Sequence, residues 1–269
     1  MTARSEGIDD TSLGSRPPTM MTGITAPARP PFHRLLRVET RKLFDTRSAK
    51  IMTLVLAGLT VALIAARGVV AGPHPRTLTG TAGVGFGTLL PVLGILTVTG
   101  EWSHRTAMTT FALEPRRHRV LAAKCLPPLV TAVAASLFAL LVTVPVTVIS
   151  ARVERVPADW NFGPLAVLGW TATNVLLVAM GLAVGMLLLS APASIVVYLS
   201  APALGTFVGH LGATGELLVR WFDLNTTVGP LAQGDMSGTE AARLAVSVTF
   251  WIVAPMTAGF VRAIRKEVN

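Results

Sequence analysis

The feature that most constrains this chain is a long stretch without formal charge, residues 160–215, between Asp159 and Glu216. As one helix these 56 residues would extend about 84 Å at 1.5 Å per residue, whereas the hydrocarbon core of a bilayer is about 30 Å thick. The stretch must therefore fold back on itself. Pro192 provides the break, because proline lacks a backbone donor and disfavours helix at the residue before it. We expect two membrane spans here, at about 163–189 and 192–211.

Four further segments are apolar and long enough to approach or complete a bilayer crossing. Residues 51–66, 77–100, 125–151 and 244–261 contain no Asp, Glu, Lys or Arg. Only 14% of the 269 residues are charged, against about 25% in soluble domains. With flanking polar side chains that reach the headgroups, we expect these spans at about 50–68, 79–100, 125–150 and 243–262. The sequence therefore predicts an all-α membrane protein with six transmembrane helices.

The distribution of basic residues predicts the orientation. If the N-terminus is cytoplasmic, the segments on that side hold 17 of the 23 Lys and Arg residues, so the positive-inside rule places both termini in the cytoplasm. Residues 1–31 are rich in Thr, Ser, Gly, Pro and Arg and are expected to form a disordered cytoplasmic tail before the membrane domain, 32–269. The first apolar segment begins at residue 51, so the first span is expected to act as an uncleaved targeting segment.

Residues 32–45 are typical of an amphipathic helix that lies flat on the cytoplasmic leaflet. Leu36 and Leu43 fall on one side of this helix and Arg37 on the opposite side. Glu39 falls in the apolar sector, where a carboxylate is costly unless it meets a basic partner or a backbone donor. The alternative is that Glu39 merely sits at the level of the headgroups.

The connection after the second span, residues 100–124, is too long for a turn. Trp102 suits a membrane interface, and Pro115 is placed as the first residue of a new helix. We expect two short helices joined near Glu114.

On the other side of the membrane, residues 212–242 contain a second candidate interfacial or re-entrant helix. Its apolar residues are Leu217, Leu218, Trp221 and Phe222. Ser237 and Glu240 then have the spacing of a capping box that opens the last span.

Three GxxxG patterns occur within the spans. Small residues four apart let helix backbones approach closely, which favours association in lipid. Packing within the chain is the favoured interpretation, and a subunit interface is the alternative. The pairs are Gly83 and Gly87, Gly181 and Gly185, and Gly205 and Gly209.

Several chemistries lack their sequence signatures. None of the four lysines follows a glycine, so the chain has no P-loop for ATP. The five histidines show no HExxH spacing and Cys125 is the only cysteine, so neither a metal site nor an intrachain disulfide is expected. The net charge of +9 is placed where anionic lipid headgroups attract it, so we expect membrane lipids as partners and no nucleic acid. No catalytic residue is predicted.

Two segments resemble a known family, the membrane permeases of type-2 ATP-binding cassette exporters. The loop after the second span follows that family's order of Glu, four residues, Thr, and then Pro, a basic residue and Lys. The preceding segment VETRKLFDTRS resembles its E-x-x-K-L-x-x-x-R opening. Arg105 departs from the pattern, since the family commonly has Gly before Thr. The matching residues are Glu101, Thr106, Pro115, Arg119 and Lys124 in the loop, and Glu39, Lys42, Leu43 and Arg47 in the opening.

The resemblance covers about residues 32–269. It implies a permease in the bacterial plasma membrane that pairs with a second copy or a related permease. Two separate ATP-binding cassette subunits would hold ATP and Mg²⁺, while this chain binds no cofactor. Their closure would push on helix 102–112 and on the flat helix 32–45. The implied coupling residues are Glu101, Trp102, Arg105, Thr106, Glu114, Pro115, Arg116, Arg119 and Lys124, with Arg37, Glu39, Lys42 and Arg47 on the interfacial helix.

The cargo is expected to be lipophilic or amphipathic, a drug, peptide or lipid, because the spans carry no charge. Thr173, Asn174 and Tyr198 are candidate groups lining its pathway. Two other functions stay open: a membrane anchor or assembly subunit that transports nothing, and an ion-coupled carrier. The second is less favoured, because such carriers usually place ionisable residues within their spans.

Overall fold

The structure is a computed structural model that describes residues 31–45, 47–103, 117–160 and 163–265. These ranges are helical and contain no strand. Six of their helices are long and apolar enough to cross a membrane, which confirms the all-α class and the six expected spans. The tail expected at 1–31 lies outside the described residues, apart from Pro31.

The helices extend beyond the predicted spans at most ends. The last span is continuous through α11, a π-helical segment η1 and α12. The elements are α1 (Phe32–Asp45), α2 (Arg47–Ala71), α3 (Pro75–Ser103), α5 (Arg117–Glu154), α6 (Pro164–Leu188), α7 (Ala191–Gly209), α8 (Ala213–Phe222), α9 (Leu224–Thr227), α10 (Gly229–Gln233), α11 (Gly238–Val248), η1 (Thr249–Val253) and α12 (Ala254–Arg265).

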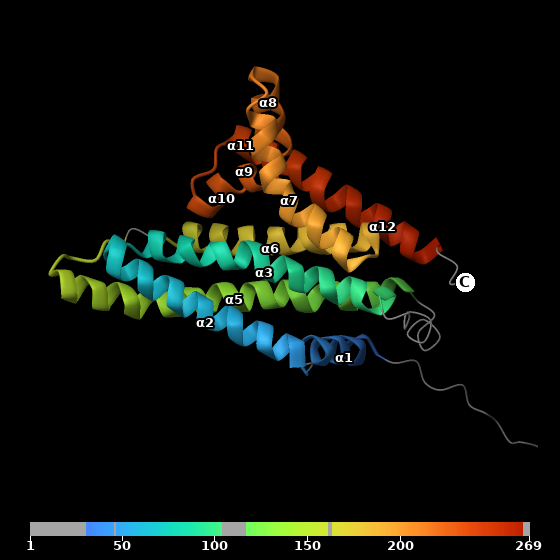
Figure 1. Ribbon diagram of the computed structural model, residues 1–269, viewed down its shortest axis with the longest axis horizontal. Helices are drawn as coiled ribbons and strands as arrows, with labels where there is room; N and C mark the ends of the chain where they lie inside the picture. The colour runs from blue at the N-terminus through green and yellow to red at the C-terminus, as the bar shows by residue number, and fades with distance from the viewer. Residues whose placement is uncertain (1–30, 46, 104–116, 161–162, 266–269) are drawn as a thin grey trace, which may run out of the picture.

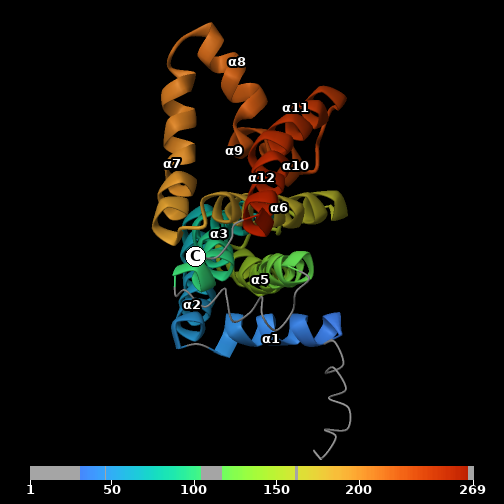
Figure 2. The same ribbon diagram turned by 90° about the vertical axis from the view of Figure 1, so that its right-hand side faces the viewer.

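Four helices, α2, α3, α5 and α6, run lengthwise beside one another (Figure 1). α3 packs against the other three, and α12 packs back onto α6. α7 and α8 rise away from these four helices, as Figure 2 shows. α1 and the end of α12 lie at the same end of the packed helices (Figure 1), the arrangement that an even number of crossings requires.

The core of the packed helices is centred on α3 and α6. Phe86 on α3 is 1% exposed, and its ring centroid lies 5.8 Å from that of Trp170 on α6. Leu90, Leu182 and Met186 are buried in the same cluster. α3 and α6 are therefore the spans that other helices cover, whereas α2 and α7 leave most of their length to the surroundings.

The break expected at Pro192 is confirmed. Leu189 adopts the left-handed conformation with φ 53°, its N–H donates to the Gly185 carbonyl, and Ser190 is extended. α7 begins at Ala191, with Pro192 in its first turn where no intrahelical N–H is needed.

The capping box is also confirmed. Ser237 Oγ accepts from the Glu240 N–H, and Glu240 Oε2 accepts from the Ser237 N–H at 2.7 Å. The residues expected to form an interfacial helix, Leu217 to Phe222, are helical in α8.

Candidate functional site

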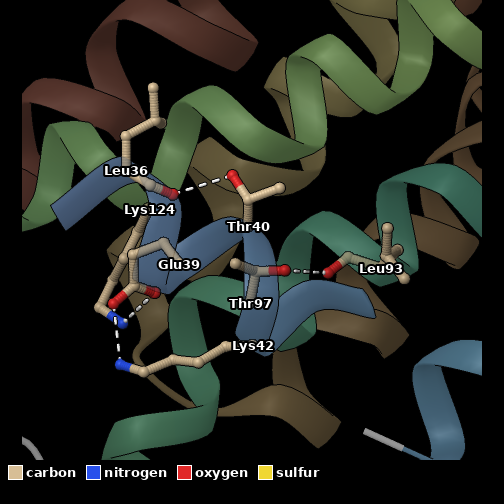
Figure 3. A network of polar contacts seen from close by, with 7 residues as sticks. All are labelled: Leu36, Glu39, Thr40, Lys42, Leu93, Thr97 and Lys124. Atoms are coloured by element: carbon tan, nitrogen blue, oxygen red, sulfur yellow. Dashed lines mark hydrogen bonds and ion pairs between the residues drawn. The ribbon is translucent and has the colours of Figure 1, made fainter. Parts of the chain in front are cut away.

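α1 lies across the packed helices and is joined to α5 by a buried ion pair. Figure 2 shows α1 lengthwise below α5, and Figure 1 shows it near one end of the packed helices. In Figure 3 the Glu39 carboxylate points from α1 toward two lysines. Its Oε2 accepts from Lys124 Nζ of α5 at 3.1 Å, and its Oε1 accepts from Lys42 Nζ at 2.8 Å. The contact therefore joins two segments separated by 85 residues in sequence.

The two partners across the contact are both shielded from solvent. Glu39 is 5% exposed and Lys124 is 3% exposed, whereas the Lys42 side chain is 48% exposed. Charge-assisted hydrogen bonds of this kind strengthen as water is excluded, and each buried charge is costly if its partner is removed. The expectation that Glu39 needs a basic partner is confirmed. Glu39 is therefore paired and covered by protein, whatever its level relative to the headgroups.

Helix periodicity explains why these groups meet. Glu39 and Leu43 are four residues apart on α1, and both are buried. They form the face that packs on α5, while Lys42, three residues after Glu39, reaches the carboxylate from the edge of that face. Thr40 donates to the Leu36 carbonyl at 2.8 Å, so its hydroxyl is satisfied within α1 (Figure 3).

The structure places the other coupling residues unevenly. Glu101 and Trp102 are in the last turn of α3, and Arg119 is in the first turn of α5. Arg37 and Arg47 are exposed. The remaining predicted coupling residues lie outside the described residues, as do the joint near Glu114 and most of helix 102–112; they are Arg105, Thr106, Glu114, Pro115 and Arg116.

The glycine pairs face other helices of the same chain. A Cβ on Gly181 would lie 2.7 Å from the Pro91 carbonyl oxygen, and one on Gly185 would lie 3.4 Å from the Ile95 Cα, so α6 approaches the backbone of α3 here. Gly83 and Gly87 face α6 side chains at ordinary contact distance. In α7, Gly205 faces Asp223, which caps α9, and Gly209 faces Val219 of α8.

Two further close approaches were not predicted. A Cβ on Gly169 would meet the Leu231 carbonyl of α10, and one on Gly259 would meet the backbone of Met186. Neither contact was predicted from the GxxxG pattern. The sequence signal for such a contact is a single glycine within a span. Glycine in a helix interior is unfavourable, so its presence there indicates close packing against a neighbouring backbone.

The three polar residues suggested as a pathway lining donate hydrogen bonds within this chain, two of them between helices. Asn174 Nδ2 donates to Ser136 Oγ at 3.0 Å and joins α6 to α5. Tyr198 Oη donates to the Gly87 carbonyl at 2.7 Å and joins α7 to α3. Thr173 donates to the Gly169 carbonyl of its own helix at 2.9 Å. All three are buried and hydrogen-bonded within this chain, so they stabilise the bundle.

Within the described ranges no group of three or more His, Cys, Asp or Glu side chains is placed to hold a metal ion. No protein-family model and no curated protein matches the chain.

Proposed function

We propose that this chain is the membrane-spanning permease subunit of a type-2 ATP-binding cassette exporter. One observation carries the proposal. The Glu39–Lys124 pair joins the two segments whose motifs resemble that family, the E-x-x-K-L opening and the Lys that ends the loop before the third span. In the sequence these motifs only follow one another, whereas in space they form one contact near the end of the bundle.

The proposed mechanism uses this contact to transmit force. Separate ATPase subunits would bind ATP and Mg²⁺ and press on α1 and on the segment that follows Glu101. α1 would pass the movement to α5 through Glu39 and Lys124. Because α5 packs on α3 and α6, the movement would reach the most buried helices and switch the bundle between inward and outward access.

The remaining parts of the proposal follow from the same assignment. Both termini would be cytoplasmic in a bacterial plasma membrane, and the permease would pair with a second copy or a related permease. The even number of long apolar helices and the shared location of α1 and the end of α12 support placing both ends on one side of the membrane, and the positive-inside rule favours the cytoplasmic side (Figure 1). The cargo would be lipophilic or amphipathic, in keeping with apolar spans. Topology reporters fused at positions 112 and 228 should lie on opposite sides of the membrane.

The deciding experiment purifies the full-length chain from its native membrane in mild detergent. We expect an ATP-binding cassette ATPase to co-purify, identified by peptides that carry a Walker A sequence. The variant Glu101→Arg should stay in the membrane and lose ATP-dependent transport. Glu154→Arg is the matched control, because Glu154 is an exposed residue at the opposite end of α5 and should leave transport unchanged.

The two other functions have distinct outcomes. If no ATPase binds and deletion alters another complex, the chain is an anchor or assembly subunit. If purified chain moves solute across liposomes without ATP, it is a self-sufficient carrier. Normal transport by Glu101→Arg would contradict the coupling role.

A further inference from the structure

An apolar cavity lies among α1, α2, α3 and α5, and the transport proposal gives it no role. Its volume is about 530 Å³. Ligand-binding cavities in proteins usually measure about 300–1,000 Å³, so this one is large enough for a substantial ligand. Its walls come from all four helices and include Phe44, Leu56, Phe86, Leu90 and Phe138.

The cavity opens sideways, between α2 and α5. Val130 and Phe138 line it on α5 and are nevertheless 59% and 37% exposed, and Thr53 on the α2 wall is exposed as well. α2 and α5 both contain candidate membrane spans. The opening therefore faces the hydrocarbon of the bilayer when these helices cross the membrane.

Most hydroxyl groups in the walls already donate a hydrogen bond within the protein, so they do not require a polar ligand. Three of the four lining threonines donate to a carbonyl four residues earlier in their own helices, at 2.7–2.8 Å. They are Thr40, Thr60 and Thr131. Most of the rest of the lining is aliphatic or aromatic. A hydrocarbon chain suits such walls, whereas a polar solute would lose its hydration without compensation.

The end of the cavity formed by α1 is bordered by basic residues. Leu36, Thr40 and Phe44 form the α1 wall, and at 100° per residue Arg37 falls at the edge of this stripe, in the direction of Phe44 but two turns before it. On α2, Lys50 lies on the same face as the lining residue Ala57 and precedes it by two turns. Arg37 and Lys50 are both exposed, as are Arg34, Arg41 and Arg47. An anionic group at the membrane surface is the charge complement of this border.

We propose that the cavity binds one acyl chain of an anionic membrane phospholipid, with the phosphate of that lipid at Arg37 and Lys50. The lipid would fill the space between α1 and the spans and stabilise α1 against them. The proposal requires only that the chain spans the membrane, and it holds whether or not an ATPase subunit binds.

The test measures phospholipid retained by the full-length chain in native mass spectrometry, after delipidation and addition of phosphatidylglycerol or phosphatidylcholine. We expect one phosphatidylglycerol per chain, retained in preference to phosphatidylcholine. Ala57→Phe should lower retention of both lipids by about tenfold, the factor expected when about two methylene groups lose their burial. Val130→Trp is the second cavity-filling variant. It is placed on the α5 wall, where the exposed side chain of Val130 leaves room for the larger residue. Val55→Phe is the control, because Val55 is on α2, is 53% exposed and does not line the cavity.

The headgroup part of the proposal has its own variants. Arg37→Gln and Lys50→Gln should each lower the preference for phosphatidylglycerol by about fivefold without abolishing retention of the chain. Arg67→Gln removes an exposed charge farther along α2 and should leave the preference unchanged.

Three results would overturn the proposal. The first is that Ala57→Phe and Val130→Trp both retain as much lipid as Val55→Phe. The second is that the unmodified chain retains the two lipids equally, and the third is that the chain forms a dimer that Ala57→Phe dissociates. The last result would mean that a second copy of the chain occupies the cavity.

Discussion

The contact between Glu39 and Lys124 makes a prediction that separates a buried ion pair from ordinary helix packing. Glu39→Leu removes the carboxylate that lies 3.1 Å from the Lys124 ammonium, a group that is 3% exposed. Removing one partner of a buried pair costs about 3–5 kcal/mol. Lys124→Met is milder, since Glu39 keeps Lys42 at 2.8 Å, and the loss is that of one charged hydrogen bond, about 1.5–3 kcal/mol.

Hydrogen exchange of the α1 amides, measured in lipid nanodiscs, reports the free energy of detaching α1. At about 1.4 kcal/mol per factor of ten, exchange should be faster by roughly 10²–10⁴-fold in Glu39→Leu and by roughly 10–150-fold in Lys124→Met, up to the limit of an unprotected helix. The α6 amides provide the internal reference. Glu216→Leu is the matched control, because Glu216 pairs with Arg220 at 3.3 Å with both side chains exposed, and such pairs contribute at most about 1 kcal/mol.

The double variant Glu39→Leu with Lys124→Met supplies the refuting result. It removes both buried charges of the contact and leaves only the half-exposed Lys42 ammonium, and apolar replacement of a buried pair is often neutral or stabilising. Its α1 amides should therefore exchange at least about tenfold more slowly than those of Glu39→Leu alone. Exchange in the double variant as fast as in that single variant would show that side-chain packing, and not the charge, governs the contact. Unchanged exchange in both single variants would show that the pair does not hold α1.

Three further predictions concern the bundle. Gly181→Ala should lower the thermal stability of the detergent-solubilised chain, because the new Cβ would lie 2.7 Å from the Pro91 carbonyl; Gly58→Ala, with nothing within 4 Å, should be neutral or stabilising by up to about 1 kcal/mol. Asn174→Leu should destabilise the same preparation by about 0.6–1.7 kcal/mol, since Asn174 donates to Ser136 of α5; equal melting temperatures would contradict a structural role. Trp251→Phe removes the 2.7 Å donation to the Phe222 carbonyl, and faster proteolysis at the end of α8 with an unchanged rate in α3 is the expected result.

The membrane fold was predictable because its causes are local. The absence of charge over 56 residues and the position of Pro192 required two spans and a break, and the chain turns at Leu189 and Ser190. Threonines within the spans are compatible with the prediction, because many of them satisfy their hydroxyls within their own helix. Thr79, Thr99 and Thr147, for example, each donate to the carbonyl four residues earlier. A polar side chain of this kind adds little unsatisfied polarity to a span.

The site was predictable only in part. The need for a partner could be read from the position of Glu39 in an apolar sector, but its identity could not, because Lys124 lies 85 residues away. The hydrogen-bond partner of Asn174 was likewise not predictable, because Ser136 lies on another helix. The cavity that opens between α2 and α5 is lined by four helices, and the sequence of no single helix predicts it.

The packing of α1 is informative because its main neighbour is α5 and not α2, the next helix in the sequence. α1 precedes α2 directly in sequence but packs more extensively on α5. The buried Glu39–Lys124 pair and the packing of α1 on α5 join the two helices, so α1 and the start of α5 would move as one body. A displacement of α1 would then reach the third span before the first. It would continue into α6 through the packing of α5 on α6 and the Asn174–Ser136 hydrogen bond. In an exporter permease, the bundle would respond to its ATPase through α5, and variants that detach α1 from α5 should uncouple transport even where every residue of the segment after Glu101 is intact.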